Sequence, residues 1–332
     1  MTVSISTLRQ QIETILTSSG YLANEIPIIT DILLYAQLRG NNQGIVKLTG
    51  KGMPRDARAG EIKVIRETPL SILLDGAHNL GMVAMEKGME LALDKARKSG
   101  FAILGTRNTA SPTGAIGYYA NRIAREGMIG WVFSGSFPIV APFGSKEPLF
   151  GTNPIAIGIP TASNPIVLDM ATSSMAWFGI MQSKMAGVSI PDHVAYDKEG
   201  YPTRQPAEAL EGAIRPFGGD FSGHKGFGLS LIVEILTGPL VGAAFCGIGD
   251  GGWGNLMFII DPGLMADTAT FLEESSRLAA RVKEAEKLPG VPEIFLPGER
   301  GDRQASQAIE KGELEIEDNL YRAFLDALNR AK

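Results

Sequence analysis

Residues 144–174 read GSKEPLFGTNPIAIGIPTASNPIVLDMATSS, and two short apolar runs in this stretch guide the interpretation of the whole chain. The runs, 154–160 and 165–170, are rich in Ile, Leu, Val and Ala and are bounded by Gly, Pro, Asn or Ser, which predicts two buried strands. The second run ends at Asp169 and a patch of small residues at 171–174. Small hydroxylated residues after a buried strand suit a bound phosphate. Alternatively, Thr172 only caps a helix that begins nearby.

The composition predicts a soluble globular protein with one large or two ordinary domains. The 332 residues are 44% hydrophobic and 20% charged. A formal net charge of −5 argues against nucleic acid or an anionic membrane as a partner. The sequence shows no signal-peptide core and no apolar stretch of membrane-spanning length, so we expect a cytoplasmic protein. One cysteine excludes an internal disulfide framework, and with three scattered histidines we expect no metal site.

The order of the expected elements predicts an α/β fold with a mixed sheet and a smaller helical portion. Two amphipathic helices open the chain, and the second ends near residue 38. Strands and helices then alternate, and charged helices close the chain. The expected strands are 61–67, 70–75, 101–106, 128–133, 154–160, 165–170 and 255–261, and the later helices are 81–99, 117–126, 172–186, 224–238, 267–287 and 314–331. We therefore expect an N-terminal helical domain at 1–68, an α/β core at 69–300, and C-terminal helices at 301–332 that pack back on the helical portion.

Common catalytic and nucleotide motifs do not fit this chain. The sequence GDGGWG at 249–254 matches G-x-G-x-x-G, but it follows a helix and precedes a strand, which reverses the order that a dinucleotide fingerprint requires. A Walker A sequence, a nucleophile elbow and an H-E-x-x-H sequence do not occur. The polar loop RGNNQGIVK at 39–47 follows a helix directly, and its simplest interpretation is a helix C-cap with a turn.

Four sequence segments, in this order, resemble the malate/L-lactate dehydrogenase family of the non-Rossmann type. They are GTNP at 151–154, PIVLDMATS at 165–173, GHKGFGLS at 223–230 and LPGER at 296–300. That family includes ureidoglycolate and sulfolactate dehydrogenases, diketogulonate reductase and the reductase of cyclic imine carboxylates. The resemblance implies an oxidoreductase that uses NAD or NADP on a small carboxylate substrate. It also implies a homodimer and a nucleotide-binding α/β core distinct from the Rossmann fold.

The resemblance also indicates which residues bind the cofactor. A Ser of the family falls on Ser136, although the Asn that precedes it there is Gly135 here. A lysine at the start of an apolar helix would hold a phosphate. Residues 219–222 resemble an insertion, so we expect a reshaped loop over the cofactor. The implied cofactor residues are Ser136, Asp169, Met170, Ala171, Thr172, Ser173, His224, Lys225, Gly298, Glu299 and Arg300.

The catalytic positions depart from the family pattern. The family loop reads S-H-G with an Arg three residues after Gly, whereas this chain has Gln43 before Gly44 and Lys47 at the Arg position. Lys47 would counter a substrate carboxylate as a point charge. The second family histidine, in N-S-N-H-F-G, falls within residues 108–114, which are one residue longer and contain no histidine. Both expected general acids are therefore absent.

Reduction of a ketone requires a proton donor, and three replacements are open. His78 could supply the proton, although its simpler interpretation is a helix-start residue bonded to backbone. Water or Ser111 relays it. Or the substrate brings it, as a protonated cyclic imine does. We thus expect an NAD(P)-dependent oxidoreductase for a small 2-oxo or 2-hydroxy acid or a cyclic imine 2-carboxylate. The alternative is a non-redox member that retains the nucleotide pocket.

Overall fold

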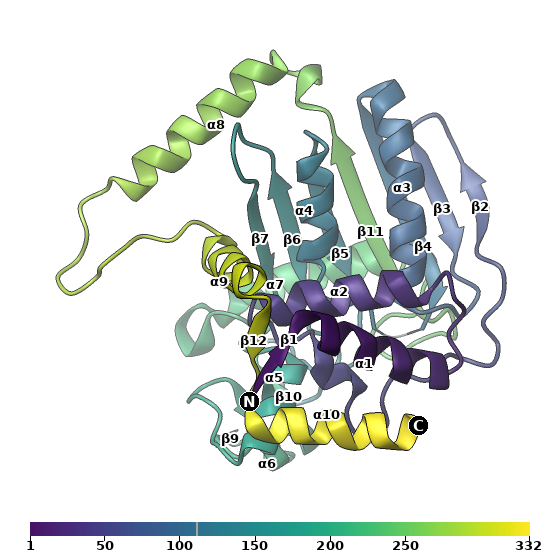
Figure 1. Ribbon diagram of the computed structural model, residues 1–332, viewed down its shortest axis with the longest axis vertical. Helices are drawn as coiled ribbons and strands as arrows, with labels where there is room; N and C mark the ends of the chain where they lie inside the picture. Colours follow the sequence, from purple (N-terminus) through teal and green to yellow (C-terminus); the bar gives the residue numbers. More distant parts are fainter. Residues whose placement is uncertain (111) are drawn as a thin grey trace.

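A seven-stranded mixed sheet forms the centre of the computed structural model, which describes residues 1–110 and 112–332 (Figure 1). Only the pair β3–β4 is parallel, and the other neighbours are antiparallel. The strands expected at both sheet edges are present, β2 and β3 at one edge and β6 and β7 at the other. In spatial order the strands are β2 (Lys63–Glu67), β3 (Ser71–Asp75), β4 (Phe101–Thr109), β11 (Trp253–Ile260), β5 (Ile129–Ser134), β6 (Ile155–Ile159) and β7 (Ile166–Met170).

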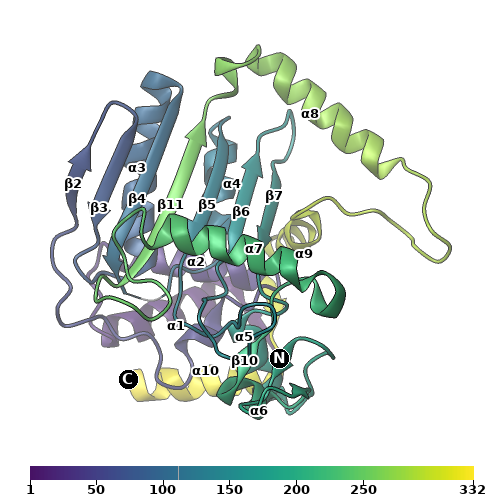
Figure 2. The same ribbon diagram turned by 180° about the vertical axis from the view of Figure 1, so that it is seen from behind.

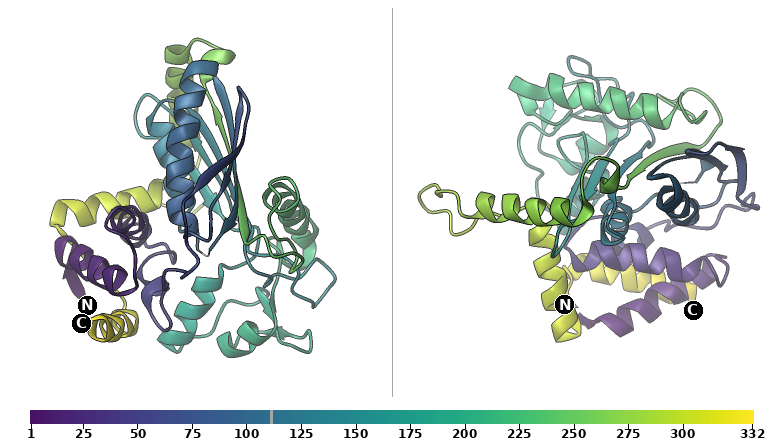
Figure 3. Two further views of the ribbon diagram at one scale, coloured as in Figure 1. Left: turned by 90° about the vertical axis from the view of Figure 1, so that its right-hand side faces the viewer. Right: turned by 90° about the horizontal axis from the view of Figure 1, so that it is seen from above.

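Helices cover both faces of this sheet. On one face lie α3 (Gly81–Ser99) and α4 (Gly117–Arg125), and on the other lies α7 (Gly219–Thr237), as Figure 3 shows. Figure 2 shows α7 crossing in front of the strands. Helix α4 lies very close to β6, because a Cβ on Gly158 would stand 2.1 Å from the carbonyl oxygen of Ala120. The N-terminus of α4 is thereby held beside the end of β7.

The helical portion joins the two ends of the chain. It contains α1 (Ile5–Ser18), α2 (Ile26–Leu38), the short helix η1 (Ile45–Leu48) and α10 (Asp318–Ala331). Strand β1 (Thr2–Ser4) pairs with β12 (Glu313–Glu315), and the N-terminal ammonium donates to the carbonyl oxygen of Ile316 at 2.8 Å. Both termini therefore lie on the same side of the molecule (Figure 1).

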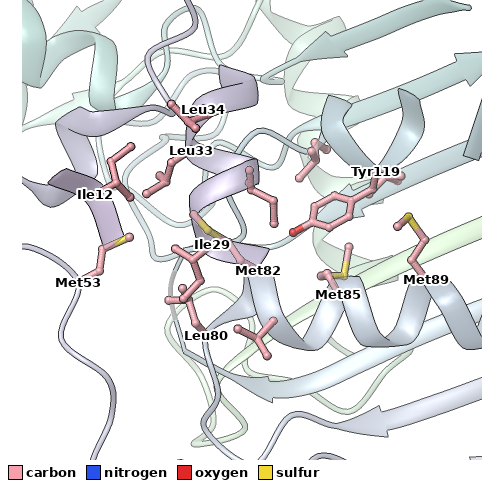
Figure 4. Packing of buried hydrophobic residues seen from close by; sticks show 14 of the residues in the cluster. Ile12, Ile29, Leu33, Leu34, Met53, Leu80, Met82, Met85, Met89 and Tyr119 are labelled. Carbon is pink, nitrogen blue, oxygen red and sulfur yellow. The ribbon is translucent and has the colours of Figure 1, made fainter. Parts of the chain in front are cut away.

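One hydrophobic core runs through the helical portion and the face of the sheet that α3 and α4 cover. Figure 4 shows Ile12 and Leu33 from α1 and α2 in the same packing as Met85 of α3 and Tyr119 of α4. The expected division at residue 68 is therefore not a break in the core. Strand β2, which lies before that residue, also belongs to the central sheet.

A smaller unit packs below the sheet around its own buried cluster, which includes Val140, Phe150, Ile180 and Ile214. It consists of α5 (Trp177–Ala186), β8 (Ala195–Tyr196), β9 (Pro202–Thr203), α6 (Pro206–Glu211) and β10 (Ala213–Ile214). Past β11, the short helix η2 (Pro262–Leu264) leads to α8 (Thr268–Lys283), which extends away from the sheet on the β7 side (Figure 1). Helix α9 (Glu299–Lys311) follows.

Several helix boundaries differ from the expected ones. The helix expected from residue 172 begins only at Trp177, because the hydroxyl of Thr172 donates to the carbonyl oxygen of Asn153 at 3.0 Å instead of capping a helix. The apolar helix begins at Gly219, so residues 219–222 are its first turn and not a loop. Helix α9 was not expected, and residues 313–315 form β12 where the last helix was expected to begin.

Two further expectations concern membranes and metals. Within 1–110 and 112–332, no helix is long and apolar enough to cross a membrane. The same residues contain no group of three or more His, Cys, Asp or Glu that could hold a metal ion.

Candidate active site

Three adjoining cavities form one crevice between the helical portion and the end of the sheet. The outer cavity, about 400 Å³, and the middle cavity, about 250 Å³, share Gly40, Asn41 and Asp169. The middle cavity and the inner cavity, about 70 Å³, share five residues, which are Gln43, Gly114, Ile116, Thr152 and Pro154. The expected site residues Gln43, Lys47, Ser136, Asp169, Met170, Ala171, Gly298 and Arg300 line this crevice.

The outer cavity has an anion-binding character on the side of α9. Gly298 precedes that helix with a φ of +85°, and a Cβ there would lie 2.8 Å from the carbonyl oxygen of Val167. The close approach places the positive end of α9 beside β7. Arg300 in the first turn is exposed and lines the cavity, and within the described chain it has no ion-pair partner. Glu299 turns away from the cavity, where it pairs with Lys283.

Asp169 stands where the outer and middle cavities meet. Its Oδ2 accepts a hydrogen bond of 3.0 Å from the backbone N–H of Gly117, at the start of α4. The carboxylate is open to water in the crevice and is surrounded by protein on its other sides. This surrounding protein raises the pKa of Asp169 to about 6, although the Gly117 hydrogen bond opposes the shift. Because the carboxylate faces the crevice, it can accept hydrogen bonds from a ligand hydroxyl.

Thr172 and Ser173 lie behind the crevice and not in it. Both are buried, and the hydroxyl of Ser173 donates to the carbonyl oxygen of Met175 at 2.8 Å. Thr172 Oγ1 accepts a hydrogen bond of 2.8 Å from Ser230 of α7. These hydroxyls hold the strand end and the GTNP turn in place, so they are not free to bind a phosphate.

The inner cavity contains a buried lysine among aromatic rings. Lys47 is only 3% exposed, and its Nζ lies 3.8 Å from the ring centroid of Phe178. The Phe137 ring packs edge-on against Trp177, with centroids 5.5 Å apart, and at a tilt of 36° against Trp253, with centroids 5.6 Å apart. All three rings line the cavity. Among the described residues of this lining, Lys47 is the only one with an ordinary acid or base group.

Burial holds the pKa of Lys47 well below its ordinary value. Removal of the ammonium from water is the cause, and in the described part of the chain no charged group contributes to the shift. Two hydroxyl side chains in the same cavity are hydrogen-bonded to each other, with Thr113 Oγ1 and Ser134 Oγ 2.8 Å apart. Gln43 donates from Nε2 to the Oδ1 of Asn42 at 3.1 Å.

Three further expected site residues, among those that the structure describes, lie outside this arrangement. His78 is half-buried with a φ of +59°, its backbone N–H donates to the carbonyl oxygen of Asn108 at 2.8 Å, and it does not line the crevice as far as the structure describes it. His224 and Lys225 are exposed on α7, where the His224 ring lies 6.0 Å from that of Phe143. Ser111 lies outside the described residues.

The sequence interpretation missed the aromatic lining and the role of α4. Two of the three tryptophans of the chain line the inner cavity, and their rarity was the available signal. The contact of Gly117 with Asp169 joins positions 52 residues apart, and no local pattern marks it.

Comparison with known proteins gives a consistent result. The family model described as malate/L-lactate dehydrogenase matches residues 3–324. The L-sulfolactate dehydrogenase of Methanothermobacter thermautotrophicus is 35% identical over 327 residues, which cover 95% of this chain and 92% of that protein. The Delta(1)-pyrroline-2-carboxylate/Delta(1)-piperideine-2-carboxylate reductase of Pseudomonas putida is 34% identical and covers 82% of this chain and 77% of its own length. The malate dehydrogenase structure from Pyrococcus horikoshii matches with a TM-score of 0.88 and 30% sequence identity, and the match covers 100% of this chain and 95% of that one.

Replacement of Lys47 by methionine is expected to stabilise the fold near neutral pH. The change removes a buried amine that has no partner charge. The free energy of unfolding should rise by about 1–3 kcal/mol as a result. Because the folded-state pKa of Lys47 is lowered, the unfolded chain binds more protons between that pKa and the ordinary lysine pKa. The stability of the wild type therefore rises with pH through this window, and the advantage of the variant shrinks.

Denaturant unfolding of Lys47→Met and wild type, near neutral pH and at alkaline pH, measures this difference. The exposed Lys51, changed to methionine, is the matched control and should shift stability by less than about 0.5 kcal/mol. A Lys47→Met variant that is less stable at every pH would show that the amine has a stabilising partner.

Proposed function

The chain belongs to the malate/L-lactate dehydrogenase family, and from this premise we propose that it reduces small cyclic imine 2-carboxylates, with the matching 2-oxo acids as poorer substrates. The relatives named above are dehydrogenases and a reductase, so the chain is an oxidoreductase that acts on a small carboxylate. Nothing in the comparisons favours the non-redox alternative. The observation that carries the choice of substrate is the lining of the inner cavity.

The inner cavity fits a cationic ring that bears a carboxylate. Lys47 offers a single positive charge for the carboxylate. The faces of Phe137, Trp177 and Trp253 suit a flat, positively charged ring. The described lining has no histidine, which is the usual acid for ketone reduction near neutral pH. A protonated imine brings its proton to the site, so it does not need that acid. The named activity of the Pseudomonas putida relative supports this choice.

The crevice fits a nicotinamide dinucleotide, NAD or NADP, which carries the hydride when it is bound. Arg300 and the start of α9 would hold a phosphate of the cofactor. Asp169 would accept a hydrogen bond from a ribose hydroxyl, and Ser136 lines the inner cavity.

A homodimer is the expected assembly, and α7 supplies a surface that supports it. The helix is apolar on its outer side as well as its inner side, and Leu229, Ile232 and Ile235 are exposed there. A helix that is hydrophobic all round is normally buried, and we propose that a second copy of this chain covers it. The single unpaired cysteine, Cys246, fits a cytoplasmic protein.

The first prediction from this proposal compares two substrates. Oxidation of NADH and of NADPH, followed spectrophotometrically, should be at least tenfold more efficient in kcat/KM with a cyclic 2-imino acid than with the matching 2-oxo acid, about 1.4 kcal/mol in the barrier. His78→Ala, assayed beside the wild type, tests the other candidate acid. Loss of oxo-acid turnover in His78→Ala, with pyruvate reduced at ordinary dehydrogenase rates by the wild type, would contradict the proposal and identify His78 as the donor.

The second prediction concerns the cofactor. Arg300→Ala should weaken binding of NADH or NADPH by the loss of one charge-assisted contact, about 1.5–3 kcal/mol in calorimetry. Arg303→Ala, one turn along α9 and paired with Glu293, is the matched control. Unchanged affinity for both nucleotides would remove Arg300 from the site. Equal weakening in Lys225→Ala would bring α7 to the cofactor, as the family resemblance implies.

The third prediction concerns assembly. Light scattering at micromolar concentration should give a dimer, and Ile232→Glu should shift the mass toward the monomer because it places a charge in the buried face. The exposed Ile309 of α9, changed to glutamate, is the control for a surface charge outside this face. A wild-type monomer with full activity would defeat the dimer proposal.

A further inference from the structure

Lys47 is set apart from the other charged residues of the chain by its surroundings. It lies on η1 at the wall of the inner cavity, and α1, α2, α5 and α10 pack against this short helix. None of these elements, as far as they are described, presents a charged group that shifts the titration of Lys47. Its Nζ lies over the Phe178 ring, 3.8 Å from the ring centroid. The amine is therefore a buried base that lacks a counter-ion until a ligand enters.

We propose that Lys47 is the proton donor for 2-oxo acid reduction, in addition to its role in carboxylate binding. This inference rests on the proposed function, because it assumes that a 2-carboxylate substrate occupies the inner cavity. It assigns a second role to a residue whose first role, by the family resemblance, is charge alone. An arginine at this position could not perform the second role, because its guanidinium does not release a proton in proteins.

Binding of the substrate carboxylate prepares the donor. A negative charge beside the buried amine favours the ammonium form, so the enzyme takes up a proton as the substrate binds. The ammonium then has three N–H donors on one nitrogen. A carboxylate oxygen and the 2-oxo oxygen sit on adjacent carbons, so one ammonium can contact both. This geometry places a transferable proton beside the atom that needs it.

The proton and electron balance of the step is complete. As the hydride forms the new C–H bond at C2, the π pair of the C=O bond moves to oxygen. One N–H bond of Lys47 breaks, and its proton forms the O–H bond of the 2-hydroxy acid. The two electrons come from the reduced nicotinamide, and Lys47 is left as the free amine. A pKa lowered toward the working pH suits a group that gives up and regains a proton in each cycle.

The donor role of Lys47 also explains why 2-oxo acids should be poorer substrates than cyclic imine acids. A protonated imine needs only the charge of Lys47, whereas an oxo acid needs the charge and the proton. Thr113 and Ser134 are hydroxyls in the same cavity, but an alcohol has no tendency to release a proton near neutral pH. They can relay a proton but cannot replace its source.

Lys47→Arg separates the two roles, because it keeps the charge and removes the transferable proton. The expected loss of kcat for the 2-oxo acid is at least about 100-fold, the usual contribution of a positioned acid. The loss for the cyclic imine acid should be less than about tenfold. Lys51→Met, at an exposed lysine outside the crevice, is the control for a nearby change. Equal losses for both substrates would overturn the proposal.

A binding measurement tests the same inference without turnover. Calorimetry of oxamate, a carboxylate that is not reduced, in buffers of different ionisation enthalpy counts the protons taken up on binding. In the presence of the cofactor, wild type should take up close to one proton between the lowered pKa of Lys47 and the ordinary lysine pKa, and Lys47→Arg should take up none. Absence of proton uptake in the wild type would overturn the proposal.

The two measurements also distinguish failure of this inference from failure of the proposed function. If the wild type prefers oxo acids over imine acids, the proposed function fails, but proton uptake with oxamate still supports Lys47 as the donor. If the imine acid is the better substrate and no proton is taken up, the proposed function stands and the donor role fails. Should Lys47→Arg not fold, the wild-type calorimetry decides alone.

Discussion

A buried polar network around Asn153 holds the GTNP turn and the end of β7, which both line the crevice, against α7. The Nδ2 of this residue donates to Glu234 at 2.6 Å and to the carbonyl oxygen of Ser230 at 3.0 Å, both on α7. Thr172 joins the network through Ser230, and Glu234 accepts the backbone N–H of Cys246 at 2.7 Å. The GTNP turn, the end of β7 and α7 are therefore locked together in the interior. Loss of one member would leave buried partners unsatisfied, so the network specifies one arrangement.

Much of the fold follows from local sequence patterns, and the remainder depends on contacts between distant residues. Alternating apolar runs predicted the sheet strands, and helical spacing predicted α1 to α4 and α10. The start of α7 was missed because Gly219 and Gly223 are poor helix formers, and tertiary packing overrides that weak preference. Strand β12 was missed because it pairs with β1, more than 300 residues earlier, and no local pattern carries that pairing.

The candidate site was predictable in its outline but not in its electrostatics. The family motifs gave eight of the residues that line the crevice, and the missing histidines were visible in the sequence. The burial of Lys47 was not, because residues 39–47 read as an exposed polar loop and the short helix η1 turns the lysine inward. For the same reason the hydroxyls of Thr172 and Ser173, which suit a phosphate by composition, are used inside the protein. Composition indicates which groups exist, and packing decides which of them reach a ligand.

The pairing of the two chain ends has a consequence for synthesis in the cell. Helices α1 and α2 are made before the sheet, but α10 packs on α1 and β12 pairs with β1 only when residues 313–331 have been made. Until then the apolar face of α1, with Leu8 and Ile12, has no complete cover. The strands of the sheet can pair earlier, whereas the helical portion is complete only once residues 313–331 have been made, so its first helix stays partly uncovered through most of synthesis.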